Sequence, residues 1–345
     1  DAFEDRGEAL APADAHGLET VAGLAALHLA EHGRKDAHAC RPDRMAEVKD
    51  LFPAVVCLQS SDEMAALTAD AIFVCVPPAA HEFYIEFALV NGVAFMCEQP
   101  ISHRLENLGA IRDRVAAGNL ICHVSNNQRY SPRVAALRNI LADGSMGGVL
   151  TGLVELGEWL PLWHPYEPYQ DYYPSWRGMG GGLDAVCDLD WLRDLFGEPV
   201  RMNAMCSRKS DLEIDTYDVV QFLVDFGEGK PQIAMHLDML QQPIARQSRI
   251  VCENGVVVHN HPDQFHRVFR AATGLWEEVP FDIDLSLFSS MPGKNQSFAE
   301  PMYLGDTLEF LRRLRESDTS LDSLVNGIRN ISLVFPHVFG DRSDG

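Results

Sequence analysis

The fold is decided by a short apolar run that ends in two prolines, 71-AIFVCVPP-78. A continuous run of β-branched and aromatic residues is typical of a parallel strand that is buried on both faces. An amphipathic stretch follows from His81 to Asn91 and ends at Gly92, a residue type that commonly follows the last turn of a helix. The run therefore predicts a buried strand, Ala71 to Val76, and then a helix.

The same alternation continues on both sides of this run. We expect further helices at residues 20–32, 44–51 and 105–117, and further strands at 54–58, 93–97 and 120–124. Strands that alternate with helices indicate a parallel sheet of the doubly wound kind. The fold class is therefore predicted as α/β, with a Rossmann-like domain of the dinucleotide-binding type in residues 1–125.

The pattern changes near Val149, where the expected strands become longer. They are expected at 149–156, 200–206, 219–226, 232–240, 248–252 and 255–260, with helices at 183–196, 302–315 and 321–333. Glu228-Gly229 and Asn254-Gly255 are typical hairpin turns. Residues 126–345 are thus predicted to form an α+β domain with an open, mainly antiparallel sheet, and a chain of 345 residues suits two domains.

Composition excludes several classes of function. A formal charge of −22 argues against nucleic-acid and anionic-membrane partners, and no apolar run is long enough to span a bilayer. No signal-peptide pattern is expected at the start of the chain. Eight scattered cysteines without a CxxC pair predict reduced thiols, a cytoplasmic location and no metal site.

Four short motifs occur in a recognisable order. They are 70-DAIFVCVPPAAH-81, 97-CEQPIS-102, 127-NQRYSP-132, and 180-GGGLD-184 followed by 187-CDLDWLR-193. Together they resemble the glucose-fructose oxidoreductase / inositol dehydrogenase (Gfo/Idh/MocA) family, as a divergent member. The resemblance implies an NAD(P)-dependent oxidoreductase that acts on a sugar or nucleotide sugar and forms a homo-oligomer through its C-terminal sheet.

The resemblance also implies roles for individual residues. The turn that holds Pro77, Pro78 and His81 corresponds to the one that faces the nicotinamide in the family. Glu98 stands in the family's Glu-Lys-Pro motif, so it is expected at the cofactor. The hinge motif places Asn127 and Arg129 on the way into the second domain, where they are expected to reach the substrate.

The dinucleotide fingerprint departs from the family pattern. Its best candidate is 17-GLETVA-22, with Gly17 at the first position and Ala22 at the third. Glu19 stands where the backbone must approach the pyrophosphate, and its carboxylate would face a dianion at a cost of about 4 kcal/mol. That cost predicts dinucleotide binding weaker by roughly a thousandfold. The alternative is that the phosphate loop lies elsewhere, although no better glycine cluster is nearby.

The end of the second expected strand carries Arg41 and no acidic residue. If a dinucleotide binds, an arginine there favours the 2′-phosphate of NADP over the ribose hydroxyl of NAD. The alternative interpretation is an exposed, solvated arginine.

Two further departures fall on proton-transfer positions. Gln99 replaces the family's lysine, and an amide can hydrogen-bond but cannot give up a proton near neutral pH. Cys187 stands where the family has histidine, as either an inert core residue or a nucleophile. Asp184 lies three residues earlier on the same helix face, so it is a candidate base or a solvated surface residue.

An aromatic segment follows the first long strand. It holds Trp159, Trp163, His164, Tyr166, Tyr169, Tyr172, Tyr173 and Trp176, followed by Arg177. Aromatic faces with polar tips suit sugars, and His164 and Arg177 could meet an anionic group. We expect Trp163, Tyr166, Trp176 and Arg177 to contact substrate and His164 to be a catalytic candidate; the alternative is a loop that packs against a partner subunit.

Three functions remain open. The first is an active NAD(P)-dependent sugar oxidoreductase. The second, which the departures at Glu19, Gln99 and Cys187 favour, is a relative that keeps the fold and a sugar-type pocket without ordinary redox chemistry, and that could act beside an active paralogue. The third is a repurposed enzyme that needs no dinucleotide.

Overall fold

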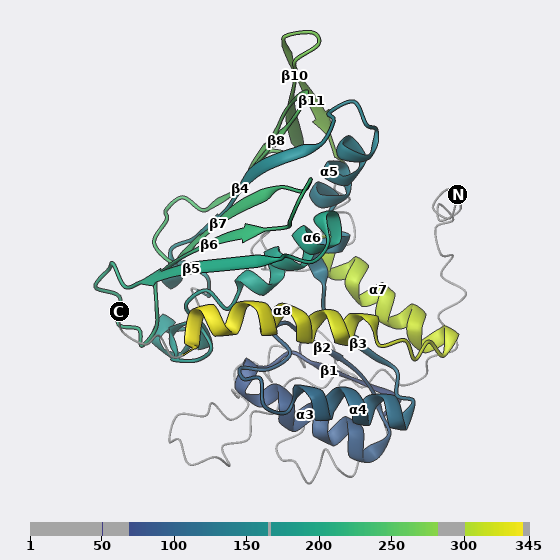
Figure 1. Cartoon of the computed structure of the whole chain (residues 1–345). Coiled ribbons are helices and arrows are strands. Elements are labelled where there is room, and N and C mark those ends of the chain that lie inside the picture. The colour runs from purple at the N-terminus through teal and green to yellow at the C-terminus, as the bar shows by residue number, and fades with distance from the viewer. Residues whose placement is uncertain (1–49, 51–68, 165–166, 282–300, 341–345) are drawn as a thin grey trace.

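The structure is a computed structural model that describes residues 50, 69–164, 167–281 and 301–340, and it contains two sheets (Figure 1). The smaller one is parallel, with strands β1 (Ala71–Val74), β2 (Ala94–Cys97) and β3 (Cys122–Val124) in that order. Helices α3 (Pro78–Asn91) and α4 (Leu108–Gly118) connect these strands. The prediction of an α/β fold with a parallel N-terminal sheet is therefore confirmed.

The apolar run forms β1 as expected, and all four residues of β2 are buried. Helix α3 ends at Gly92, which has a φ of 66° and closes the helix in the left-handed conformation. The helix begins at Pro78, three residues before the predicted start. Proline suits the first helical position, because its missing N–H has no partner there in any case.

The larger sheet has the strand order β11-β10-β9-β8-β4-β7-β6-β5. Its strands are β4 (Val149–Gly157), β5 (Arg201–Ser207), β6 (Val219–Asp225), β7 (Gln232–Asp238), β8 (Ala245–Cys252), β9 (Gly255–Asn260), β10 (Phe265–Arg270) and β11 (Leu275–Pro280). Only the β4–β7 pair is parallel. The open, mainly antiparallel sheet is thus confirmed, and the hairpin of β10 and β11 is an addition to the prediction.

Four helices complete the described C-terminal part: α5 (Pro132–Ala142), α6 (Ala185–Phe196), α7 (Pro301–Glu316) and α8 (Asp322–Phe339). Short 3-10 turns occur at Asn127–Tyr130, Leu160–Leu162, Tyr169–Asp171 and Tyr173–Ser175. Helix α8 crosses between the two sheets and contacts β3, β5 and α6 (Figure 1). Helices α7 and α8 come last in the chain but pack against the parallel sheet, and the domain boundary near residue 126 stays a prediction.

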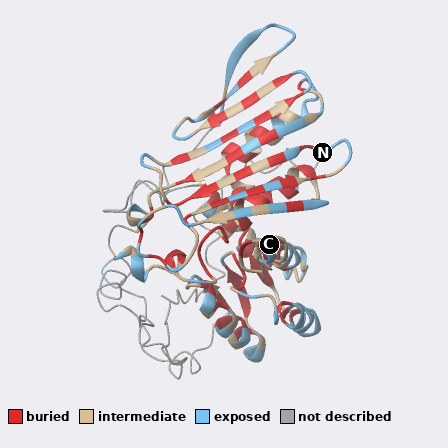
Figure 2. Cartoon of the chain, turned by 60° about the vertical axis from the view of Figure 1, so that its left-hand side comes forward, coloured by how far each residue is buried: buried red, intermediate tan, exposed pale blue. Residues whose placement is uncertain are grey.

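Burial alternates along the strands of the large sheet (Figure 2), so one face packs on the helices and the other is more open. One large core joins the parallel sheet, α6, α8 and the inner face of the large sheet. A small second core of Leu160, Leu212, Ile214 and Met239 supports the aromatic segment. No helix in the described ranges is long and apolar enough to cross a membrane.

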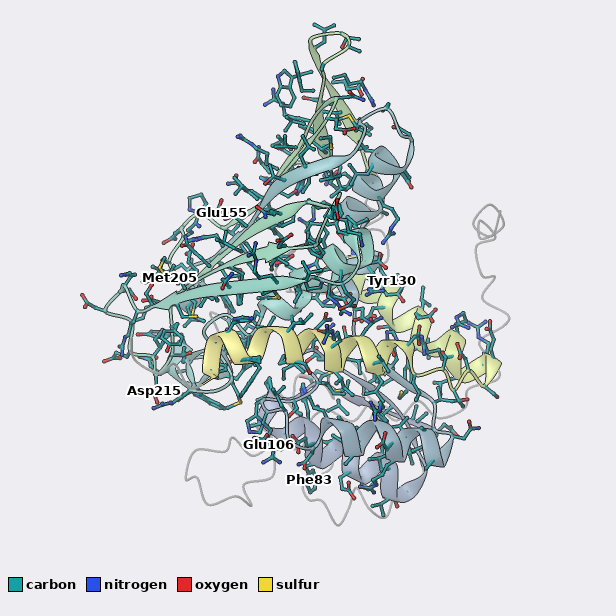
Figure 3. All side chains as sticks on the ribbon, viewed as in Figure 1. Phe83, Glu106, Tyr130, Glu155, Met205 and Asp215 are labelled. Atoms are coloured by element: carbon teal, nitrogen blue, oxygen red, sulfur yellow. The ribbon has the colours of Figure 1, made fainter. Side chains whose placement is uncertain are left out.

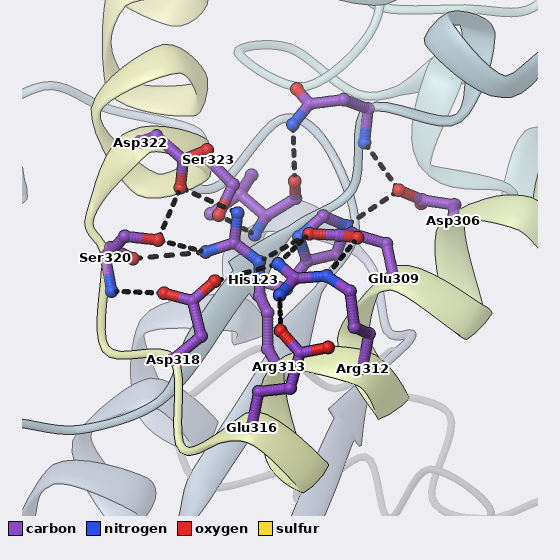
Figure 4. A network of polar contacts seen from close by, with 12 residues as sticks. His123, Asp306, Glu309, Arg312, Arg313, Glu316, Asp318, Ser320, Asp322 and Ser323 are labelled. Atoms are coloured by element: carbon purple, nitrogen blue, oxygen red, sulfur yellow. Dashed lines mark hydrogen bonds and ion pairs between the residues drawn. The ribbon is translucent and has the colours of Figure 1, made fainter. Parts of the chain in front are cut away.

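A buried polar network fastens α7 to the end of β3 (Figure 4). The carboxylate of Asp306, which is 1% exposed, lies 2.7 Å from Nε2 of His123 and accepts hydrogen bonds from Oγ of Ser125 and the backbone N–H of Asn126. The hydroxyl of Ser323 on α8 accepts from the backbone N–H of Val124. Three donors compensate the buried carboxylate, so the network holds both C-terminal helices on the parallel sheet.

Candidate functional site

The candidate site begins where β1 and β2 end, at the edge of the parallel sheet where ligands bind in folds of this kind. Cys75 follows β1, and Glu98 follows β2, with its backbone N–H bonded to the carbonyl of Val74. Glu98 is an exposed residue, yet the protein around its carboxyl group and the charge of Asp306 raise its pKa to about 7. This carboxyl group can therefore exchange a proton near neutral pH.

His81 lies beneath this edge rather than in it. Its ring is buried, with Nε2 2.7 Å from the carbonyl oxygen of Val76 and Nδ1 2.9 Å from that of Pro100. Burial lowers its pKa to about 4, against the two carbonyl oxygens, which raise it; a neutral ring donates to only one of these oxygens, whereas a protonated ring donates to both. The geometry makes His81 a tie between the turn after β1, which holds Pro77 and Pro78, and the loop after β2.

Gln99 turns its amide toward the segment that follows β3 and toward α8. Its Nε2 donates to the backbone oxygen of Ser125 at 2.7 Å and to Oδ1 of Asn126 at 2.9 Å. Its Oε1 accepts from Nδ2 of Asn330 on α8 at 3.3 Å. The donor and acceptor atoms of this amide are thus engaged by the hinge and by α8.

Asp184 lies at the start of α6, beside the ring of Tyr173. The Tyr173 hydroxyl donates to Oδ1 of Asp184 at 3.4 Å. Burial, and to a lesser degree the charge of Asp188, raises the pKa of Asp184 to about 6. Burial also raises the pKa of Tyr173 well above its usual value, and the charges of Asp184 and Glu98 add to this. Tyr173 thus lies beside Asp184, and the charge of Glu98 also acts on its hydroxyl.

The glycine-rich turn before α6 explains how Asp184 reaches Tyr173. A Cβ atom on Gly180 would lie 1.7 Å from the carbonyl oxygen of Pro174, which directly follows Tyr173. Gly181 and Gly182 have φ angles of 65° and 101°, which disfavour other residue types. The motif 180-GGGLD-184 therefore allows the tyrosine segment and the start of α6 to touch.

Cys187 occupies the first turn of α6. Burial raises the pKa of its thiol well above the usual value, and the charges of Asp184, Asp188 and Asp190 add to the effect. The neutral thiol is a poor nucleophile at pH 7. Asp188 accepts from the indole N–H of Trp191 at 2.8 Å, so this acid has a structural partner.

The hinge residue Arg129 is held by acidic residues of α6. Its guanidinium donates to both oxygens of Asp190, at 2.5 and 3.0 Å, and to Asp194 at 3.0 Å. Asn127 begins the 3-10 turn that carries Arg129. Arg129 is therefore committed to the junction of hinge and helix, and the predicted contact of Asn127 and Arg129 with substrate stays a prediction.

The aromatic segment places His164 against Tyr172, with ring centroids 3.9 Å apart. The His164 Nδ1 lies 2.8 Å from Oε1 of Glu167. Trp163 and Trp176 donate their indole N–H groups to the backbone oxygens of Glu158 and Gln170. Tyr172 packs edge-on against Tyr173 at 4.7 Å, so the segment reaches Asp184 through a row of rings.

The structure brings only some of the predicted residues together. Trp163 and Asp184 line one small pocket with Gly182, Tyr217 and the end of β7. A larger cavity, of about 350 Å³ between α5, α6 and β4, shares no residue with it. Arg177 is exposed. Five predicted site residues lie outside the described residues: Gly17, Glu19, Ala22, Arg41 and Tyr166.

Sequence reasoning missed Tyr173 as a site residue, although its place among the aromatic residues was a signal.

Comparisons with known proteins agree with this architecture. A family model described as an oxidoreductase family with an NAD-binding Rossmann fold, GFO_IDH_MocA, matches residues 24–126, which begin after the expected phosphate turn. Inositol 2-dehydrogenase of Rhizobium meliloti is 28% identical over 204 residues, which are 55% of this chain and 60% of the relative. The corresponding enzyme of Paracoccus denitrificans is 27% identical over 36% of each chain.

Solved structures match over a greater length. Levoglucosan dehydrogenase, in complex with NADH and levoglucosan, is similar with a TM-score of 0.70 and 18% identity over 86% of this chain and 85% of that one. A myo-inositol dehydrogenase from Corynebacterium glutamicum gives a TM-score of 0.63 and 19% identity over 85% and 83% of the two chains. Residues 24–126 therefore match the Gfo/Idh/MocA family of oxidoreductases with an NAD-binding Rossmann fold, and the parallel sheet and the large sheet have the fold of these solved structures.

Proposed function

We propose that this chain binds a sugar-like small molecule between Glu98 and the aromatic segment but does not catalyse hydride transfer in the usual manner of the family. The observation that carries the proposal is the amide of Gln99. This residue stands in the lysine position and uses its donor and acceptor atoms on Ser125, Asn126 and Asn330. An amide in this state has no proton to exchange with a substrate hydroxyl.

Cys187 supports the same proposal. Histidine titrates near neutrality and can act as a general acid or base, but a thiol whose pKa is raised by burial cannot. Two proton-transfer positions are thus filled by groups that do not exchange protons at pH 7. The faces of the described aromatic side chains of this segment suit the C–H surface of a sugar ring.

The cofactor side of the proposal rests on fewer described residues. Pro77, Pro78 and Glu98 are the described residues that would face a nicotinamide, which would supply or accept a hydride when bound. The residues expected at the pyrophosphate and the ribose, Gly17, Glu19, Ala22 and Arg41, lie outside the described ranges. From the sequence we propose weak dinucleotide binding because of Glu19, with NADP preferred over NAD because of Arg41.

A ligand titration tests the proposal. Calorimetry with polyols and nucleotide sugars is expected to find a binder whose affinity falls at least tenfold in Trp163→Ala, while Phe83→Ala, at an exposed aromatic of α3, leaves the affinity unchanged. With the same binder and NAD or NADP, the native chain is expected to show no turnover. Saturable oxidation or reduction of the binder would contradict the proposal.

A second candidate function is favoured by the contact between Tyr173 and Asp184. Burial gives Asp184 a pKa of about 6, and Glu98 has one of about 7, so both carboxyl groups can exchange protons near neutrality. An oxidoreductase or a cofactor-independent enzyme could use this pair in place of lysine and histidine. Turnover that disappears in Asp184→Asn but persists in Gln99→Ala would support this second function over the first.

The assembly and location of the protein are also proposals. The open face of the large sheet exposes Leu153, Leu223 and Met205, and the register of β4, β7, β6 and β5 brings these side chains into neighbouring rows. We propose that this face joins two copies of the chain, or this chain and an active paralogue. The free cysteines of the described residues suit a reducing compartment such as the cytoplasm.

A further inference from the structure

Three metal-ligating side chains meet on the open face of the large sheet, and one of them, Asp238, also lines the small pocket of Trp163 and Asp184. Glu155 projects from β4, and His236 and Asp238 project from β7. The parallel register places Glu155 opposite His236, and Asp238 lies two residues further along the same strand face. One ligand atom from each residue lies within 4.8 Å of the others. Figure 3 shows Glu155 on the side of the sheet away from α5 and α6.

We propose that Glu155, His236 and Asp238 form a binding site for a divalent cation, with zinc as the ion that fits best. One imidazole and two carboxylates are a donor set that zinc accepts, usually in tetrahedral geometry with a fourth ligand. The two carboxylates balance the double positive charge of such an ion.

The amide of Gln241 marks the position of the ion. Its Nε2 donates to Oε1 of Glu155 at 2.8 Å and to Oδ2 of Asp238 at 2.6 Å. His236 directs Nε2 at the same oxygen of Asp238, at 2.8 Å. Donor groups therefore converge on the two carboxylates, where a cation would satisfy the same oxygens. If the amide turns over, its Oε1 becomes available as a fourth ligand.

The backbone nearby leaves room for this arrangement. A Cβ atom on Gly157 would lie 2.2 Å from Nε2 of Gln241 and 2.8 Å from Oδ2 of Asp238. Glycine at the end of β4 is thus the residue that lets the amide and the carboxylate meet. A larger residue there would push Gln241 away from Glu155.

The neighbours of the ligands hold them in position, as is usual around metal sites. The second oxygen of Asp238 accepts from the backbone N–H of Leu240 at 2.8 Å. The Nδ1 of His236 lies 3.0 Å from Nε2 of Gln221 on β6; with a metal on Nε2 of His236 the ring proton moves to Nδ1, and the Gln221 amide would turn its Oε1 toward it. Within the described ranges, His236 is the only ion-pair partner of Asp238, and neither carboxylate is paired with lysine or arginine.

A metal titration tests this site. Purified protein is stripped with a chelator and titrated with Zn²⁺ by calorimetry and with Co²⁺ by visible absorption. We expect one ion per chain, and affinity at least tenfold lower in His236→Ala and in Glu155→Ala. Gln241→Glu is expected to bind Zn²⁺ at least tenfold more tightly, because it adds a third carboxylate. Glu228→Ala, at an exposed hairpin turn, is the matched control and should bind like the native chain.

Two results would overturn the proposal. The first is a native chain that binds neither Zn²⁺ nor Co²⁺. The second is binding that His236→Ala and Glu155→Ala leave unchanged while both variants keep the circular dichroism spectrum of the native chain. The gain expected for Gln241→Glu protects the test against misfolding, because a disrupted sheet cannot produce tighter binding.

Discussion

At the scale of single residues, Gln99 has structural partners at the position where the family resemblance implies a lysine. Its amide bridges the hinge and α8, which lie far from it in the sequence. The sequence revealed that a lysine was missing, because the position belongs to a recognisable motif. It could not reveal the partner Asn330, since 231 residues separate the two.

The bridge predicts the effect of removing the amide. Gln99→Ala leaves Asn126 and Ser125 without this donor, and we expect the free energy of unfolding to fall by about 1–3 kcal/mol. Urea unfolding measures this loss. Gln247→Ala, at an exposed glutamine of β8, should stay within about 0.5 kcal/mol of the native chain. Equal losses of unfolding free energy in the two variants would show that the Gln99 amide does not stabilise the contact of this loop with Asn126 and α8.

Asp184 predicts a dependence of stability on pH. Its pKa rises from 3.8 in the unfolded chain to about 6 in the folded one, so the folded state binds the proton more tightly. Stability from this group is therefore present at low pH and is lost as pH rises from about 4 to 6. Over this range the free energy of unfolding of Asp184→Asn should rise relative to that of the native chain, by at most about 3 kcal/mol. Urea unfolding at several pH values measures this difference. If the free energy of unfolding depends on pH in the same way in both proteins, the raised pKa of Asp184 in the folded chain is contradicted.

At the scale of elements, periodicity predicted every strand of the parallel sheet that the structure describes. It missed α5, whose apolar residues form a weak pattern, and the edge hairpin of β10 and β11. Strand β11 carries Glu277 and Glu278 and is largely exposed, so it lacks the alternation that marks a half-buried strand. Charged residues at a sheet edge are common, because they discourage pairing with other chains.

The buried polar network between α7 and the end of β3 gives a prediction at this scale. Asp306→Ala would leave His123, Ser125 and the N–H of Asn126 without their buried acceptor, and we expect a loss of roughly 3–5 kcal/mol in unfolding free energy. The exposed Asp113 on α4 offers a control, since Asp113→Ala should change stability by less than about 0.5 kcal/mol. Chemical denaturation followed by circular dichroism separates the two cases. A small effect of Asp306→Ala would mean that α7 is held mainly by its apolar face.

At the scale of the whole molecule, the two sheets and α8 between them bring Gln99, which follows β2, next to Asn330 of the last described helix. The family and the fold could be predicted from four short motifs. The contact between Tyr173 and Asp184, and the cluster of Glu155 with His236, could not, because they depend on how distant strands and loops align.

The open face of the large sheet predicts association: Leu223→Glu should shift light-scattering mass toward the monomer, whereas Val90→Glu on α3 should not. An unchanged mass in Leu223→Glu would exclude this face as the interface.

The most direct measurement is the absorbance of reduced nicotinamide over hours, with concentrated native protein, the sugar or polyol that calorimetry identifies, and NAD or NADP in turn. Because Gln99 and Cys187 exchange no protons near neutral pH, we predict no reduction above the rate without protein. Steady, saturable formation of NADH or NADPH that scales with protein concentration would contradict the proposed function.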